Sequence, residues 1–248
     1  MARGSVVEHE HAGDGTSGVP AAVLGGFLGH DHCRQVADFA GEAYRAGEMV
    51  RNVFQAKAWV ANLDQRHTLR PHDPCWDVVQ RLRETVVGAL GVQAWREDTY
   101  LKEFVSYITA GGFVVRHRDD WQLERPDLDC RVRCNVFVQK EPGSGDPCLG
   151  AEEPAEGAHE LRLRLSTGDL LAFSPSMTLH RATRVSGQPK VMVSFGFVIT
   201  EATFRETLER LRSHAQWRPL AAYTKQDTGF SASSRRGRAS HPSLTGTS

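Results

Sequence analysis

Two histidines and one aspartate have the spacing from which a metal site can be built. His117 and Asp119 stand at the end of the apolar run GGFVVRH and just past it, and His180 ends the later segment FSPSMTLH. In an extended strand, residues i and i+2 point to the same side, so His117 and Asp119 can bind one cation together. Two imidazoles and one carboxylate form the facial ligand set that holds Fe(II) and leaves positions open for substrate and dioxygen.

A fourth residue, Lys190, strengthens this interpretation. A histidine and an aspartate two positions apart are common by chance, and a histidine at a strand end is more often a surface or hydrogen-bonded residue than a ligand. Lys190 opens the apolar segment KVMVSFGF shortly after His180. Its ammonium could therefore reach back across a turn toward a metal held by the other three.

Rival ligand-rich segments have simpler explanations. The segment GHDHC at 29–33 stands at the start of an expected helix, where Asp31 is a natural cap. The segment HEH at 9–11 lies in a polar, glycine-rich stretch without periodicity. His67 and His72 flank a proline turn, and we expect both to face water.

The elements around these residues change character along the chain. Apolar residues recur at helical period in HDHCRQVADFAGEAYRAGE and PCWDVVQRLRETVVGALG, which predicts two helices within residues 30–95. Between about 100 and 200 the chain consists of short β-branched and aromatic runs separated by turn residues, as expected of antiparallel strands. One of these is ELRLRLS, in which leucines alternate with arginines. A last helix is predicted over 201–214.

This order predicts one mainly β domain over residues 19–223, with a closed or sandwiched barrel braced by flanking helices. Residues 1–18 and 224–248 are polar and rich in glycine or serine, so we expect them to form disordered arms. The stretch 141–160 is rich in glycine and acidic residues, and we expect it to be a mobile loop near the site.

Composition excludes several classes of partner. Thirty basic residues balance thirty acidic ones, which argues against nucleic acid or an anionic membrane as the partner. The five cysteines are odd in number and lack the spacing of a zinc site, so they indicate reduced thiols in the cytoplasm. No segment is long and apolar enough to span a bilayer. We expect a cytoplasmic protein with a small-molecule partner, as a monomer or a homodimer.

Over about residues 100–200, the strings GGFVVRHRD, GDLLAFSPSMTLHRATRV and KVMVSFGF resemble the Fe(II)- and 2-oxoglutarate-dependent oxygenases. The similarity is greatest to the prolyl-hydroxylase-like branch. The resemblance implies a double-stranded β-helix core of the jelly-roll or cupin-like kind, with Fe(II), 2-oxoglutarate and O2 as cofactor and cosubstrates. It makes His117, Asp119 and His180 the iron ligands and catalytic residues.

The resemblance also implies how 2-oxoglutarate is bound. Lys190 would pair with the distal carboxylate, with Arg184 as the alternative, and Tyr107 matches a tyrosine that hydrogen-bonds the cosubstrate in several prolyl hydroxylases. Two positions depart from the pattern: most of the family has Arg where this chain has Lys190, and a frequent Ser or Thr is replaced by Met192. Asp119 keeps its carboxylate, which favours hydroxylation, since halogenating relatives carry Gly or Ala there.

Candidate substrate residues follow from alternation and adjacency. In RVRCNVFV one strand face is apolar, while Arg133 and Asn135 lie on the other. If that face lines the barrel mouth, Arg133 could meet a substrate carboxylate and Asn135 a donor or acceptor; otherwise Arg133 lies in solvent. Asp120 could bind a substrate amine, and Trp121 could cover the site or simply pack.

The expected reaction is therefore hydroxylation of an unactivated C–H bond in a small molecule, with release of succinate and CO2. A free or carrier-linked amino acid is the leading substrate class. A prolyl-type hydroxylase of peptide or protein side chains is the first alternative. A non-catalytic β-barrel that binds a ligand is the second, and it requires the three candidate ligands to lie apart.

Overall fold

The computed structural model describes residues 19–51, 64–91, 95–98, 103–119, 129–150 and 160–224. The arms expected at 1–18 and 224–248 lie outside these ranges, Thr224 excepted, and so do the HEH segment, Asp120 and Trp121.

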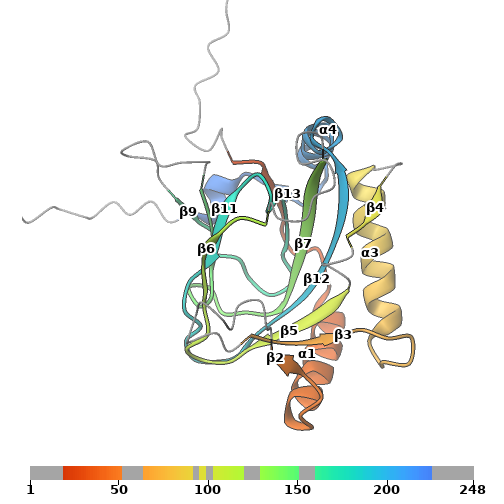
Figure 1. Ribbon diagram of the computed structural model, residues 1–248, viewed down its shortest axis with the longest axis vertical. Coiled ribbons are helices and arrows are strands. Elements are labelled where there is room, and N and C mark those ends of the chain that lie inside the picture. The colour runs from red at the N-terminus through yellow and green to blue at the C-terminus, as the bar shows by residue number, and fades with distance from the viewer. Residues whose placement is uncertain are drawn as a thin grey trace, which may run out of the picture.

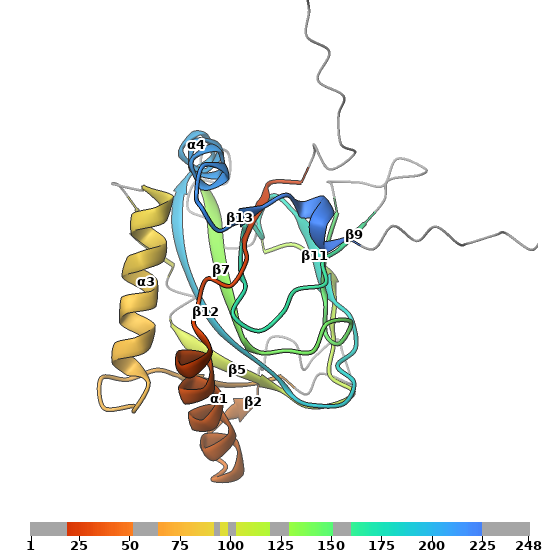
Figure 2. The ribbon, with the colours of Figure 1, turned by 180° about the vertical axis from the view of Figure 1, so that it is seen from behind.

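Two antiparallel sheets face each other, and the α-helices cover the outer side of the larger one (Figure 1; Figure 2 shows the same layers from behind). The strands of the larger sheet are β1 (Ala21–Leu24), β2 (Val50–Arg51), β3 (Asp64–Thr68), β4 (Arg96–Glu97), β5 (Phe104–Ile108), β7 (Asp129–Gln139), β10 (Leu170–Phe173), β12 (Lys190–Thr200) and β13 (Trp217–Arg218). They run in the order β13-β1-β10-β7-β12-β5-β3-β2, and β4 pairs with β12. The strands of the smaller sheet are β6 (Val114–His117), β8 (Pro147–Gly150), β9 (Leu161–Arg162) and β11 (Leu179–Ala182), in the order β6-β11-β8-β9.

The described helices are α1 (His30–Arg45), α3 (Trp76–Leu90), α4 (Glu201–Arg212) and the short 3-10 helix η1 (Leu220–Tyr223). α3 ends at Gly91, whose left-handed backbone (φ 62°) is a usual helix stop. α4 begins at Thr200, whose hydroxyl accepts the backbone N–H of Thr203. Among the described residues, no helix combines the length and the apolar run that a membrane span requires.

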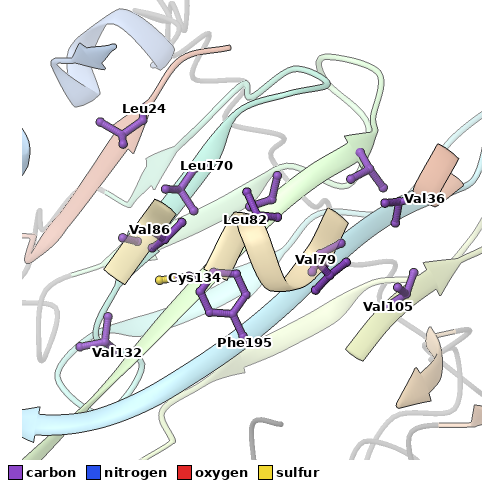
Figure 3. Packing of buried hydrophobic residues seen from close by; sticks show 14 of the residues in the cluster. Leu24, Val36, Val79, Leu82, Val86, Val105, Val132, Cys134, Leu170 and Phe195 are labelled. Atoms are coloured by element: carbon purple, nitrogen blue, oxygen red, sulfur yellow. The ribbon is translucent and has the colours of Figure 1, made fainter. Parts of the chain in front are cut away.

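The main core lies between the helices and the larger sheet (Figure 3). Val79, Leu82 and Val86 of α3 pack in the same cluster as Cys134 of β7 and Phe195 of β12. Burying one large apolar side chain of this kind contributes about 1.5–3 kcal/mol. The apolar residues that recur at helical period on α3 therefore pack against those that alternate along β7 and β12.

The opposite face of the larger sheet looks toward the smaller sheet. A second cluster joins Phe137 of β7, Phe173 of β10 and Leu149 of β8, so it includes side chains from both sheets. Arg133 and Asn135 alternate with the helix-facing residues of β7 and therefore share this inner face with Phe137. The predicted division of this strand into an apolar and a mixed face is what the structure shows.

Several local expectations need correction. The 30–95 segment contains β2 and β3 in addition to its helices, and 141–160 contains β8. In ELRLRLS only Leu161 and Arg162 form a strand, although Leu163 and Leu165 are fully buried. These strands are short, and each pairs with a strand that is distant in the sequence. Local periodicity therefore did not indicate them.

Two polar residues also differ from expectation. His67 is buried and does not face water. Its Nε2 is bonded to the Asp73 carboxylate at 3.0 Å, and its ring packs edge-on against Phe39. Asp31 is not the helix cap: Gly29 occupies that position, and Asp31 lies in the first turn near Arg34.

Candidate metal centre

His117 and His180 are direct partners across the antiparallel pair β6–β11. Their ring centroids lie 4.2 Å apart at an interplanar angle of 50°. Neighbouring strands bring residues this close only when the register places them opposite each other. The smaller sheet therefore brings together two imidazoles that are far apart in the sequence.

Asp119 completes a compact group just beyond the end of β6. One ligand atom from each of His117, Asp119 and His180 lies within 4.8 Å of the others, and Asp119 Oδ1 is 3.3 Å from His117 Nε2. The Asp119 backbone N–H donates to Pro175 O at 2.8 Å, which ties it to the segment before β11. Within the described ranges, this is the one group of three or more acidic, histidine or cysteine side chains that could hold a metal ion.

Main-chain carbonyls orient both histidine rings. His117 Nδ1 lies 2.8 Å from Val115 O, and His180 Nδ1 lies 3.0 Å from Thr178 O. A carbonyl oxygen only accepts, so each Nδ1 carries a hydrogen, and in the neutral form of either ring the lone pair lies on Nε2. His180 Nε2 is buried and has no hydrogen-bond partner in the described part of the chain. A buried ring nitrogen without a hydrogen-bond partner is what a metal ligand is expected to be before the metal binds.

The electrostatics keep His180 and Asp119 in the protonation states that bind metal. Burial, Arg133 and His117 together lower the pKa of His180 to about 3, so its imidazole is neutral near pH 7. Burial raises the pKa of Asp119, but Arg133 and the two imidazoles outweigh it and hold that pKa well below its usual range. A neutral imidazole and an ionised carboxylate are the ligating forms of these side chains.

Two arginines of β7 hold Asp119 in place. Arg133 Nη2 bonds Asp119 Oδ2, the oxygen that faces away from His117. Arg131 Nη1 donates to the Asp119 backbone carbonyl at 3.1 Å, and Arg131 Nε lies 3.2 Å from Asp98 Oδ2. Sequence reasoning named Arg133 but missed Arg131 and Asp98; the alternation that singled out Arg133 and Asn135 would also have included Arg131.

Lys190 lies on the inner face of the larger sheet. It is 4% exposed, and its Nζ donates to Gly145 O at 3.1 Å. It alternates along β12 with the helix-facing Val191 and shares its side with Met192 of the inner cluster. Arg184, the alternative cation, is exposed, bonds Gly111 O and stacks over Phe113. Of the two cations, the structure turns Lys190 inward and Arg184 outward.

Tyr107 does not face this interior. On β5 it pairs with Val191 of β12, and its ring stacks on Tyr44 of α1 with centroids 4.4 Å apart. It therefore belongs to the helix-covered face, and the expected hydrogen bond from Tyr107 to the cosubstrate gains no support. Spacing from His117 identified the residue but carried no information about which face it occupies.

Asn135 lies on the inner face, as Arg133 does. Its Oδ1 accepts a hydrogen bond of 2.8 Å from Ser194 Oγ of the neighbouring strand. This bond fixes the amide plane, and both residues are buried. The interpretation that placed Arg133 in solvent does not hold, because its guanidinium is on Asp119.

Comparison by sequence finds no matching family model and no matching curated protein. Solved structures that resemble the fold include two prolyl hydroxylases and an epimerase. A prolyl-4-hydroxylase of Pseudomonas putida is 17% identical, with a TM-score of 0.52 over 72% of this chain and 92% of its own. A Trichoplax adhaerens prolyl hydroxylase, solved with a peptide fragment of the hypoxia inducible factor oxygen degradation domain, is 16% identical, with a TM-score of 0.55 over 75% and 86%.

The third is SnoN, a non-heme, alpha-ketoglutarate-dependent epimerase of nogalamycin biosynthesis, 15% identical with a TM-score of 0.54 over 73% of this chain and 78% of its own. At these identities the likeness concerns the fold. The chain has the fold of the Fe(II)- and 2-oxoglutarate-dependent oxygenases, and the expected double-stranded β-helix core with flanking helices is confirmed.

Proposed function

We propose that this protein is an Fe(II)- and 2-oxoglutarate-dependent oxygenase that hydroxylates an unactivated C–H bond of a small molecule. The observation that carries the proposal is the convergence of three ligand atoms within 4.8 Å, in which the buried His180 Nε2 has no other partner among the described residues. The alternative of a non-catalytic barrel required these groups to lie apart, and they lie together.

In this proposal His117, Asp119 and His180 hold the iron. Bound Fe(II), with 2-oxoglutarate and dioxygen, supplies the oxidation of the substrate C–H bond, with release of succinate and CO2. The protein supplies orientation. Carbonyls of Val115 and Thr178 fix the two imidazoles, and Arg133 fixes the carboxylate so that Asp119 Oδ1 faces His117.

Lys190 is the proposed partner of the distal carboxylate of 2-oxoglutarate. Its side chain is buried on the same inner face as Asn135 and Arg133, where a charge-assisted hydrogen bond is stronger than in water. Arg184 is a poorer candidate, because its side chain is exposed at the surface, whereas Lys190 is buried on the inner face.

The proposed substrate is a free or carrier-linked amino acid. Arg133 and Asn135 put a cation and an amide on the inner face, and these groups suit the carboxylate and the polar groups of such a molecule. Asp120 and Trp121 remain proposed substrate contacts next to Asp119. A prolyl-type peptide hydroxylase is the competing assignment, because two of the structural neighbours are named prolyl hydroxylases.

The test is succinate release from 2-oxoglutarate in the presence of Fe(II) and dioxygen. Candidate substrates are free amino acids, carrier-linked amino acids and proline-containing peptides, with Asp119→Ala and His180→Ala as controls. We expect Fe(II)-dependent succinate release that rises with one class of substrate and is absent from both variants. Release driven by peptides alone would favour the prolyl-type assignment, and no Fe(II)-dependent consumption of 2-oxoglutarate would overturn the proposal.

A further inference from the structure

Lys190 lies against a glycine in the turn before β8. Gly145 has a left-handed backbone (φ 61°), and its carbonyl oxygen accepts the Lys190 ammonium at 3.1 Å. A methyl group at Gly145 would lie 3.1 Å from Lys190 Cδ, 3.4 Å from Lys190 Cε and 2.9 Å from Val185 Cγ2. The lysine stem thus lies in space that only glycine leaves open, and the same residue bonds the charged end.

A buried ion pair anchors this turn. Asp146, the next residue, has no exposed side-chain surface and accepts Lys140 Nζ at 2.5 Å and Arg162 Nε at 3.0 Å. Lys140 is equally buried and donates also to Leu165 O at 2.9 Å. A fully buried pair with its hydrogen bonds satisfied resists displacement, because moving either partner leaves an uncompensated charge.

The turn is also bonded to the chain segment that leads from His180 to Lys190. Gly145 N donates to Arg184 O at 3.1 Å, and Asp146 exchanges two hydrogen bonds with Thr183 at 2.8 and 2.9 Å. A continuous series of hydrogen bonds therefore links the segment that follows the candidate metal ligand His180, through this turn, to the Lys190 ammonium.

We propose that Gly145 is a positioning residue for 2-oxoglutarate, because it holds the Lys190 ammonium at a set place relative to the metal ligands. This inference rests on the proposed function, in which Lys190 binds the distal carboxylate. A lysine side chain has many rotamers, and holding it in one conformation removes an entropic cost from binding. An ammonium carries three N–H donors, so the bond to Gly145 O is compatible with a further bond to a carboxylate.

The test compares two alanine substitutions in the same turn. Gly145→Ala places its methyl on Lys190 and Val185. Gly143 also has a positive φ (89°), but a methyl there would meet nothing within 4 Å, so Gly143→Ala strains the turn without contacting the lysine. The readout is the dissociation constant of 2-oxoglutarate for the full chain loaded with Mn(II), measured by calorimetry, with Mn(II) affinity measured separately.

We expect Gly145→Ala to weaken 2-oxoglutarate binding by roughly tenfold or more, as displacement of a charged hydrogen bond does. Gly143→Ala should weaken it less, and Mn(II) affinity should stay near that of the unmodified protein in both. If Gly145→Ala folds poorly, the double variant Gly145→Ala/Val185→Ala removes the clash with valine and keeps the contact with lysine. Equal effects of the two glycine substitutions, or unchanged binding in Gly145→Ala or in the double variant, would overturn the inference.

Lys190→Met separates this inference from the function on which it rests. If the unmodified protein shows no Mn(II)-dependent binding of 2-oxoglutarate, or if Lys190→Met binds it normally, the proposed cosubstrate site itself is wrong. If Lys190→Met loses binding while Gly145→Ala keeps it, the site stands and the positioning role of Gly145 does not.

Discussion

The His180 ring meets the Phe173 ring edge-on, with centroids 5.2 Å apart and planes at 68°. His180 belongs to the smaller sheet and Phe173 to the larger, so this contact spans the two layers of the barrel. Edge-to-face packing fixes the ring plane, and the Thr178 carbonyl fixes its rotation. The histidine is thus oriented before any metal binds, which is the condition for a site with little reorganisation.

Removal of a proposed ligand should strongly weaken metal binding without unfolding the protein. We expect His180→Ala and Asp119→Ala each to weaken Mn(II) affinity by on the order of 100-fold or more, because each removes one of three protein ligands. Calorimetric titration of the metal-free protein measures this. His72→Ala is the matched control, since His72 is exposed. Comparable affinity in the His180 and His72 variants would contradict the assignment.

Arg133 should affect the metal through Asp119. Its guanidinium bonds the carboxylate oxygen that faces away from His117, so Arg133→Met should weaken Mn(II) binding by roughly 10- to 100-fold. Arg181 forms a comparable pair with Glu160, and Arg181→Met serves as the control. Unchanged Mn(II) affinity in Arg133→Met would show that Asp119 is held without the arginine.

The Lys140–Asp146 pair should be important for folding. Lys140→Met leaves the buried Asp146 carboxylate without its main cation, which should lower the free energy of unfolding by about 3–5 kcal/mol. Arg162 bonds the other oxygen of Asp146 but is about half exposed, and Arg162→Met should cost about 1 kcal/mol or less. Urea unfolding followed by circular dichroism distinguishes the two. Similar losses in both variants would argue against a special role for the buried pair.

The His67–Asp73 pair should contribute to stability in a pH-dependent way. Burial raises the pKa of Asp73, but the Arg70 backbone N–H at 2.6 Å and the bond to His67 outweigh it, so the pKa lies below its ordinary value of 3.8. A lowered pKa in the folded state means that the ionised carboxylate stabilises the protein above that ordinary value. This contribution should be lost as the pH falls below it.

Thermal unfolding of the unmodified protein and of Asp73→Asn at pH 7 and at pH 3 measures this contribution. We expect the difference in stability between the two proteins to shrink at the lower pH. A difference that stays constant across this range would exclude the proposed linkage.

Periodicity predicted the face on which a side chain lies wherever that face depends on a single strand or helix. The alternation along residues 131–138 predicted that Arg133 and Asn135 share a face, and they do. The same reasoning failed for β8, because a four-residue strand has no periodic pattern of its own and forms through pairing with β11 and β9. Periodicity was not the basis for Tyr107, whose expected role came from the resemblance; its spacing from His117 does not specify the strand face, and the structure places its ring against Tyr44.

The local sequence pattern was enough to place His117 beside Asp119 and to indicate a β-rich core, since both follow from the two-residue repeat of an extended strand. The approach of His180 to His117, the choice of Lys190 over Arg184 as the inward cation, and the contact of Lys190 with Gly145 could not be read in that way. Each depends on register between segments distant in sequence, and register is set by the packing of the whole barrel.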